Sequence, residues 1–186
     1  MRTPTLLLSA ILSGCLAAPQ RSQPAADPRL AAAEALIDAF YSFDPAPLRS
    51  ALAAAPASAP EILYYQGWAQ GGNYVVLNRR PCRVEQANEV SCAITVRDDL
   101  IAALGTGRDV TDTFHLSFEE GRIVRVRTTS DDPPEFAQAL QQLRRDCPEL
   151  LTTGACRGFF DGGPTPGDCV REVVRSFADF ASRRRN

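Results

Sequence analysis

Residues 110–130 read VTDTFHLSFEEGRIVRVRTTS. Apolar and polar residues alternate on both sides of the central Glu-Glu-Gly, which is the pattern of two antiparallel strands with one buried face. A three-residue Glu-Glu-Gly loop puts Gly121 in the left-handed position and pairs Leu116 with Val124. A two-residue turn would instead place Leu116 opposite Arg125 and mix apolar with charged positions. The stretch therefore predicts a hairpin whose buried face carries Asp112, Phe114, Leu116, Phe118, Val124, Val126 and Thr128.

A second hairpin is predicted immediately upstream, from strands at residues 74–84 and 89–97. The intervening Gln86-Ala87-Asn88 fits a three-residue loop, because asparagine tolerates the left-handed conformation that the last position needs. This register sets Cys82 opposite Cys92 on the same face, close enough for a covalent bridge. We therefore expect a Cys82–Cys92 disulfide, with two free thiols as the alternative.

Asp-Pro pairs precede three predicted helices. Aspartate is a good N-cap, and proline at the first helical position loses no hydrogen bond. The third pair, Asp132-Pro133, is followed by Glu135 in the position of a capping box. The predicted helices cover residues 28–41, 45–54 and 133–147. Residues 62–68 fit either a short helix or a strand, because periodicity alone does not separate the two.

The C-terminal part predicts a glycine- and proline-rich loop at 158–167 and a last amphipathic helix at about 168–181. A further short helix is predicted at residues 98–104, before Gly105. The chain has six cysteines. Those downstream of residue 97 are interpreted together: Cys147 lies on an apolar helical stripe and is expected to be the buried free thiol. A disulfide would then join Cys156 to Cys169, with Cys147–Cys156 as the competing pair.

The N-terminus has the pattern of an export signal. Arg2 precedes the apolar run Leu6 to Leu12, which is too short to span a bilayer. The run ends in Leu12-Ser13-Gly14-Cys15, which resembles the lipobox of bacterial lipoproteins. The resemblance implies cleavage before Cys15 and acylation of that cysteine with palmitate-like chains, which suffice for stable anchoring. An ordinary secretory signal with an accidental cysteine is the alternative.

The lipobox resemblance divides the chain into three parts. Residues 1–14 are interpreted as the signal peptide, 15–26 as the lipidated cysteine with a flexible tether, and 27–186 as one domain. The resemblance implies an extracytoplasmic protein held at the cell envelope by its lipid. Leu16 follows the cysteine where aspartate is associated with inner-membrane retention, which favours the outer membrane in a Gram-negative host. Disulfides form and persist in that compartment.

The composition argues against several classes of function. The formal charge is −2 and the arginines are interspersed with acidic residues, so no basic face for nucleic acid is expected. One histidine and the lack of a Cys-X-X-Cys motif give no support to a zinc or haem site. We therefore expect no metal and no cofactor.

The layout of residues 27–130, helices followed by hairpins of a curved sheet, resembles an NTF2-like (SnoaL-like) domain. In particular, the segments Val110–Leu116 and Gly121–Val124 are similar to the closing strand pair of such domains. The resemblance implies an α+β cone: a curved antiparallel sheet packed with N-terminal helices, here with two additional C-terminal helices. Such domains include isomerases, dehydratases and cyclases as well as non-catalytic members, so the fold alone does not decide function.

Asp112 is the strongest candidate for chemistry, because it shares an apolar strand face. Desolvation there raises the pKa of a carboxyl group and suits it to act as a general base. The family resemblance implies Tyr41, at the flank of the first helix, as its partner. The structural alternative is that Asp112 only caps or binds neighbouring backbone. His115 is expected on the opposite face, across from Arg125, and is interpreted as a surface residue.

Two other groups of residues have a functional and a structural interpretation. Tyr64, Tyr65 and Trp68 either line a ligand pocket or belong to the core. Acidic pairs stand at predicted helix starts and at a turn, where acids have local roles; these pairs are Asp98-Asp99, Glu119-Glu120 and Asp131-Asp132.

We expect a membrane-anchored domain that binds a small hydrophobic ligand or an envelope protein and performs no catalysis. The alternative is a small-molecule isomerase, dehydratase or cyclase that uses Asp112 and Tyr41. A third class is a structural envelope component that assembles with other proteins. A dimer is compatible with all three.

Overall fold

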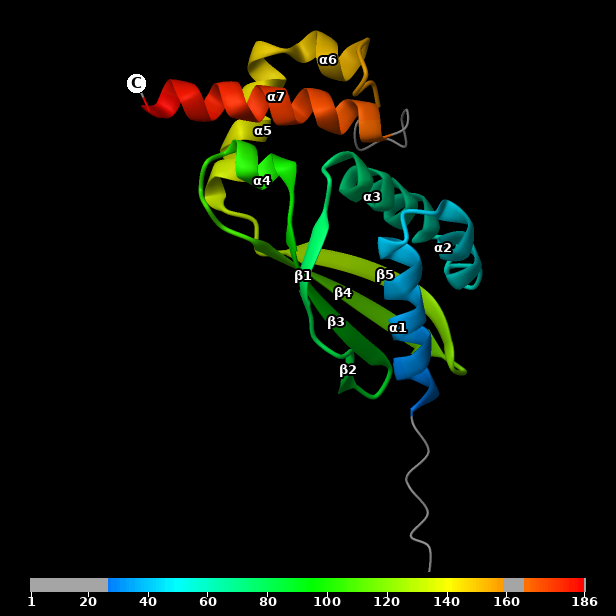
Figure 1. Ribbon diagram of the computed structural model, residues 1–186. Coiled ribbons are helices and arrows are strands. Elements are labelled where there is room, and N and C mark those ends of the chain that lie inside the picture. The colour runs from blue at the N-terminus through cyan, green and yellow to red at the C-terminus, as the bar shows by residue number, and fades with distance from the viewer. Residues whose placement is uncertain (1–26, 159–165, 186) are drawn as a thin grey trace, which may run out of the picture.

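The computed structural model describes residues 27–158 and 166–185. Over these ranges the chain is an α+β structure that combines seven helices with one curved, open, antiparallel sheet of five strands (Figure 1). The strands are β1 (Val75–Arg79), β2 (Arg83–Gln86), β3 (Glu89–Arg97), β4 (Val110–Glu119) and β5 (Arg122–Ser130). Their order is β1-β3-β4-β5. Strand β2 pairs with the same edge of β3 as β1 does, but at the opposite end of that edge. The predicted α+β class is confirmed.

The helices occupy two regions around the sheet (Figure 1). They are α1 (Pro28–Tyr41), α2 (Pro45–Ala51), α3 (Ala59–Gly71), α4 (Asp99–Ala103), α5 (Pro134–Asp146), α6 (Pro148–Thr152) and α7 (Pro166–Arg185). Helix α1 packs on β3 and β5, and α2 and α3 follow it. Helices α4 to α7 gather at one end of the sheet, where α7 packs on α3, α4 and α5.

Two of the predicted Asp-Pro helix starts are confirmed. The Asp27 carboxylate accepts a hydrogen bond from the backbone N–H of Arg29 at 2.9 Å. The Asp44 carboxylate does the same for Ala46, also at 2.9 Å. Each side chain thereby satisfies one of the free N–H groups of its helix start.

The third predicted start is wrong. Helix α5 begins at Pro134, with Pro133 in the cap position and no side-chain cap. The Asp132 carboxylate instead accepts a hydrogen bond from the Ser130 hydroxyl at 3.0 Å. Because two prolines follow Asp132, the helix starts one residue later than predicted, and the Asp132 side chain does not cap it.

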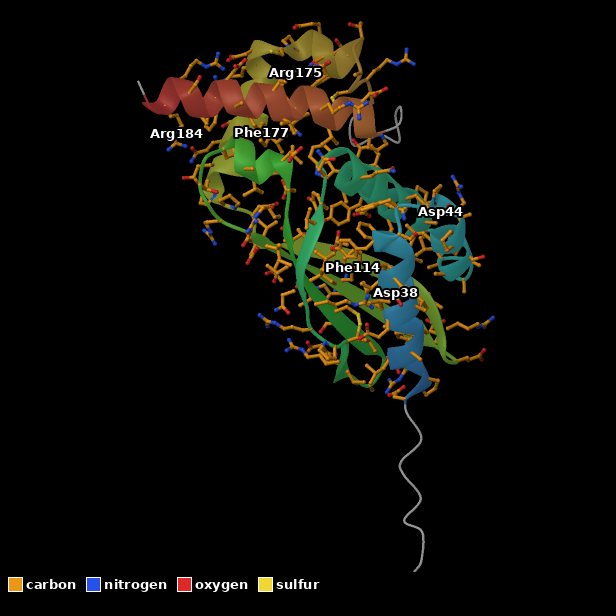
Figure 2. All side chains as sticks on the ribbon, viewed as in Figure 1. Asp38, Asp44, Phe114, Arg175, Phe177 and Arg184 are labelled. Carbon is orange, nitrogen blue, oxygen red and sulfur yellow. A yellow bond between two sulfur atoms is a disulfide. The ribbon has the colours of Figure 1, made fainter. Side chains whose placement is uncertain are left out.

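The main core lies between α1 and the sheet. Phe40 from α1 and Phe114 from β4 are fully buried, and their ring centroids are 4.9 Å apart. Figure 2 shows Phe114 between the sheet and the helices, and Phe177 on the side of α7 that faces the sheet. The predicted buried face of β4 is confirmed, since its buried residues are Val110, Asp112, Phe114, Leu116 and Phe118.

The predicted pairing of β4 with β5 is wrong by two residues. Leu116 pairs with Val126 rather than with Val124. The turn has two residues, Glu120 and Gly121, both with positive φ (49° and 76°). Two consecutive positive φ angles are the geometry of a type I′ turn, whose twist matches that of the flanking strands.

A β-bulge explains why the face prediction nevertheless holds. Phe118 pairs with Ile123 and Ser117 with Arg125, so Val124 is an extra residue in β5. The extra residue shifts the later part of β5 by one position and returns Val126 to the core. Ile123 takes the buried place that was predicted for Val124, which is half-buried.

The upstream hairpin also turns over two residues, Ala87 and Asn88, rather than the predicted three. Neither residue has a positive φ, and a bulge follows Val84, which pairs with Val90. The strand predicted over residues 74–84 is divided into β1 and β2 around Pro81. Proline lacks the N–H that a continuous ladder needs at this position.

Residues 62–68 are helical, as part of α3, which decides between the two sequence interpretations. The Gln66 side chain in this helix is buried, with 3% of its surface exposed. Its amide donates to the carbonyl oxygens of Ala39 (3.0 Å), Phe40 (2.9 Å) and Asp44 (3.2 Å). These bonds hold α3 against the C-terminal end of α1.

The C-terminal region contains three helices rather than the predicted two. Pro148 starts the short helix α6 immediately after α5 ends. The last helix, α7, is longer at both ends than predicted, and its apolar stripe is buried except for the half-buried Val174. The confirmed buried positions are Val170, Val173, Phe177 and Phe180.

Both expected disulfides are present. Cys82 is bonded to Cys92 and Cys156 to Cys169. Cys147 is the free thiol of the described residues, but it is half-buried rather than buried. Cys147 is the C-cap residue of α5 and lies beyond Leu143, the last buried residue of that helix, which explains the difference.

The predicted signal peptide, the lipidation site Cys15 and the tether lie outside the described residues. Within those residues, no helix is both long and apolar enough to cross a membrane.

Candidate functional site

A pocket of about 260 Å³ opens between α3, the residue before β1, the end of β5 and the first half of α5. Aromatic side chains line it from several directions: Tyr64, Tyr65, Trp68, Tyr74 and Phe136. Its other lining residues are Glu61, Thr128, Thr129, Ser130, Asp132 and Leu140. An apolar wall with a few convergent polar groups is typical of small-molecule sites. We call this site the aromatic pocket.

A second hollow, of about 550 Å³, lies between α5, α6 and α7. Four of its six charged side chains form two ion pairs, Arg175 with Glu172 and Arg183 with Asp146. Charges that already have partners offer little to a ligand. The aromatic pocket is therefore the candidate site.

Helix α3 supplies three of the aromatic residues, and two contacts fix its position. Gln66 holds it to α1, as described above. At its C-terminal end, Gly71 lies against Gly167 of α7, and a Cβ on Gly71 would lie 2.6 Å from the Gly167 Cα. Only glycine permits this approach of the two backbones. Tyr64 and Trp68, one helical turn apart, then share the side of α3 that lines the pocket.

The aromatic rings pack at steep angles. Tyr65 and Tyr74 have ring centroids 6.4 Å apart and planes inclined by 87°. Phe136 is supported from behind by Phe177 of α7, at 5.4 Å and 86°. Tyr65 also lies 6.2 Å from Phe114, so the pocket wall is continuous with the main core. Steep ring angles of this kind are the preferred geometry of aromatic pairs.

Asp112 lies one layer behind this wall. The structure places it on the buried face of β4, with 1% of its surface exposed and no hydrogen-bond partner for its Oδ2. Burial raises its pKa to about 7, although hydrogen bonding to the Tyr65 hydroxyl opposes the shift and the charge of Asp132 adds to it. Tyr65 lines the pocket and Asp112 does not. Tyr65 and Ser130, which line the pocket and whose hydroxyls lower the pKa of Asp112, connect this carboxyl group to the pocket.

Two further carboxyl groups lie near Asp112. Asp98 is the N-cap of α4 and accepts from the N–H of Ile101 at 2.8 Å, yet it is only 3% exposed. Burial raises the pKa of Asp98 to about 6, opposed by that backbone bond. Asp132 lies at the exposed rim of the pocket, where partial burial also raises its pKa, opposed by its bond with Ser130. Asp98 therefore has the local role predicted at a helix start, and its burial adds a raised pKa to that role.

Tyr41, the partner suggested for Asp112, is placed differently. Its hydroxyl is buried without a hydrogen-bond partner among the described residues, and it does not line the pocket. Burial, followed by the charge of Asp112, raises its pKa. Its ring packs against Phe40 and Phe114, at 4.9 and 6.4 Å. Tyr65 of α3, which was not predicted as a partner of Asp112, interacts with this carboxyl group through its hydroxyl.

His115 lies on the face of the sheet opposite the core, where it was predicted. It pairs with Arg127 rather than with Arg125, as a result of the corrected register. Its ring nitrogens lie 3.2 Å from the Glu89 carboxylate and 3.2 Å from the Thr129 hydroxyl. These contacts are those of a half-buried surface histidine.

The structure brings the three aromatic candidates Tyr64, Tyr65 and Trp68 together in one pocket. It adds Tyr74 and Asp132, which the sequence analysis did not assign to a site. Tyr74 precedes an edge strand and Asp132 follows the opposite edge strand, so only the curvature of the sheet brings them together. No local pattern could have shown this proximity.

The pocket can accommodate a small organic molecule between aromatic rings, with carboxylates and hydroxyls at its rim. Among residues 27–158 and 166–185, no three His, Cys, Asp or Glu side chains are grouped so that they could hold a metal ion.

Comparisons with known proteins found no match: no family model, no curated protein and no solved structure corresponds to the chain. The resemblance to NTF2-like domains therefore rests on the layout of helices and strands.

Proposed function

We propose that the protein is a lipid-anchored, extracytoplasmic binding domain whose aromatic pocket holds a small organic molecule. The observation that carries the proposal is the pocket itself, in which five aromatic side chains border a volume of about 260 Å³. Binding in such a pocket gains free energy from burial of the apolar surface of the ligand. The volume suits a ligand smaller than most drug molecules.

Two features support the extracytoplasmic location. The Cys82–Cys92 and Cys156–Cys169 disulfides fit an oxidising compartment, because such bonds rarely persist in a reducing cytosol. The lipobox-like sequence that ends at Cys15 supports the lipid anchor. Residues 15–26 would then separate the domain from the membrane.

We also propose that the fold is of the NTF2-like type. A long N-terminal helix against a curved antiparallel sheet, with a pocket at one end of the sheet, supports this assignment. Helices α5 to α7 would be an extension that completes one wall of the pocket through Phe136 and Leu140.

Trp68 offers a direct test, because it is the single tryptophan of the chain and lines the aromatic pocket. A library of small neutral, cationic and anionic organic compounds would be screened by Trp68 fluorescence, with calorimetry to confirm the hits. Leu140→Tyr adds volume at the pocket wall and should weaken binding at least about tenfold. Gln141→Tyr makes the same side chain at the neighbouring exposed position and should bind as the wild type does.

The proposal fails if no compound of any charge class binds. It also fails if Leu140→Tyr and Gln141→Tyr, both folded by circular dichroism, bind every hit with the affinity of the wild type.

One observation favours a second candidate, a small-molecule isomerase, dehydratase or cyclase. A carboxyl group with a pKa of about 7, such as that of Asp112, is suited to accept a proton at neutral pH. Tyr65 would carry the proton between the substrate and this carboxyl group. Turnover of small hydrophobic carbonyl compounds would be measured for Asp112→Asn and for His115→Ala. An enzyme would lose turnover in the first variant and keep it in the second; absence of turnover in the wild type would argue against this candidate.

A further inference from the structure

We infer that the aromatic pocket selects organic cations, such as quaternary ammonium compounds, over neutral and anionic molecules of the same shape. This inference rests on the proposed function, because it names the ligand class of the same pocket. Two properties of the pocket carry it, its charge and its rings.

The charged lining of the pocket is acidic. Glu61 and Asp132 are its carboxylates, and none of the described arginines, nor His115, lines it. The chain contains no lysine. Behind the wall lie the buried Asp112 and Asp98; burial is the main cause of their raised pKa values, and repulsion by Asp132 adds to it. A cation in the pocket would relieve this repulsion, whereas an anion would increase it.

The rings provide a second, independent attraction. Tyr65 and Tyr74, whose ring planes are inclined by 87°, both line the pocket. Trp68 and Phe136 border the same space. The face of an aromatic ring attracts a cation through its quadrupole, most strongly in tryptophan, and several rings around one site form a cage for alkylammonium groups.

An alkylammonium ion fits both properties better than a metal ion does. Its methyl groups are apolar and gain free energy when they are buried against rings. A hard metal ion requires several oxygen ligands at short distance, and the described carboxylates are not grouped in that way. The cation that suits this pocket is therefore organic.

Three probes of nearly the same shape test the inference. Choline carries a positive nitrogen where 3,3-dimethylbutan-1-ol carries a carbon atom, and 3,3-dimethylbutanoate replaces the alcohol by a carboxylate. Binding to the full mature protein in non-ionic detergent would be measured by Trp68 fluorescence and by calorimetry. We expect choline to bind at least about tenfold more tightly than the alcohol, and the carboxylate to bind most weakly.

Charge variants separate the attraction to a cation from the shape of the pocket. Asp132→Asn should weaken choline binding about tenfold and leave the affinity for the alcohol unchanged. Glu61→Gln tests the same effect at the other lining carboxylate, without touching the bond between Ser130 and Asp132. Glu119→Gln, an exposed acidic residue at the far end of β4, makes the same change in net charge and should have no effect. Salt should weaken the binding of choline and not that of the alcohol.

The outcomes distinguish this inference from the proposed function. If the alcohol or the carboxylate binds as tightly as choline, the selectivity for cations is overturned while the binding function stands. The same holds if only neutral or anionic library compounds bind and Leu140→Tyr blocks them. If no compound of any class binds, the binding function fails, and this inference fails with it.

Discussion

The side-chain amide of Gln66 donates a hydrogen bond of 2.9 Å to the backbone carbonyl of Phe40, near the C-terminal end of α1. The same amide also donates hydrogen bonds to the backbone carbonyls of Ala39 and Asp44. Carbonyl groups at the end of a helix lack partners within the helix, and here a buried side chain supplies one. Because Gln66 belongs to α3, this contact also fixes the helix that carries Tyr64, Tyr65 and Trp68.

Replacement of Gln66 should therefore affect both stability and binding. Gln66→Ala removes the buried hydrogen bonds from its amide to three carbonyl groups and should lower the free energy of unfolding by about 1–3 kcal/mol, measured by urea denaturation. Binding of pocket ligands should weaken as well, because α3 loses its anchor. Gln70→Ala, at an exposed position of the same helix, is the matched control and should change stability by less than about 0.5 kcal/mol. Equal losses in the two variants would contradict this role of Gln66.

The buried carboxyl groups predict how stability depends on pH. In the folded state the pKa of Asp112 is about 7, well above its ordinary value of 3.8. Between these values the folded state holds a proton that the unfolded state has lost, so the free energy of unfolding falls as pH rises from about 4 to about 7. A shift of this size corresponds to a loss of up to about 4 kcal/mol. Asp98, with a pKa of about 6, should contribute in the same direction over the lower part of this range.

Asp112→Asn should make this pH dependence less steep, as measured by urea denaturation at pH 5 and pH 8. The groups that interact with Asp112 come from several neighbouring elements: Tyr41, Tyr65, Tyr74, Asp98, Ser130 and Asp132. Asp179→Asn, at an exposed position of α7, should leave the pH dependence as it is in the wild type. If the free energy of unfolding changes with pH equally in Asp112→Asn and in the wild type, Asp112 does not titrate in this range.

Two tyrosines near Asp112 should respond differently to loss of their hydroxyl. Tyr41→Phe removes a buried hydroxyl that has no partner among the described residues, so stability should be unchanged or higher by up to about 1 kcal/mol. Tyr65→Phe removes the hydroxyl that interacts with Asp112, so the pKa of Asp112 should rise further. The fall in stability with pH should then extend to higher pH. An identical pH profile for the two variants would show that Tyr65 has no special relation to Asp112.

The disulfides give a prediction for peptide mapping. Non-reducing digestion should yield a peptide that joins Cys82 to Cys92 and another that joins Cys156 to Cys169, with Cys147 recovered as a thiol. Replacement of either pair by serines should lower the free energy of unfolding by about 3 kcal/mol, because each bridge restricts the unfolded chain. Cys147→Ser should have a much smaller effect, since no bond is lost. A peptide that joins Cys82 to a C-terminal cysteine would contradict the strand pairing.

The lipid anchor is tested by Cys15→Ala. The wild type should incorporate a labelled fatty acid and fractionate with membranes, whereas the variant should remain unlabelled and be either uncleaved or released. Trp68 fluorescence of the released domain should be unchanged, because residues 1–26 precede the first helix. A wild type that takes up no fatty acid would contradict the lipoprotein assignment.

Local patterns in the sequence predicted much of the fold. Alternation along residues 110–130 identified the buried face of β4, including Asp112, because burial of a strand face requires a period of two. Asp-Pro pairs located the starts of α1 and α2, because a cap acts within one turn of its helix. Opposed cysteines in one hairpin identified the Cys82–Cys92 bridge, since that contact spans few residues.

Predictions failed where two local solutions had similar merit. A two-residue turn at Glu120-Gly121 appeared to mix the faces of β4 and β5, and only the bulge at Val124 makes it consistent. A bulge costs little and leaves no clear sequence signal, so the register depended on how the whole sheet packs. Residues 62–68 were ambiguous for the same reason, until packing of Gln66 against α1 required a helix.

The sequence by itself determined the buried face of β4 and the burial of Asp112, and it favoured both disulfides over their alternatives, because each depends on contacts between residues close in the chain or on one strand. Only the tertiary structure decided which residues form the aromatic pocket. Tyr74 and Asp132 flank opposite edges of the sheet, and they meet because the sheet curves and α3 and α5 close its end. Curvature is a property of the assembled sheet, produced by strand twist and by the packing of α1, and no short segment contains it.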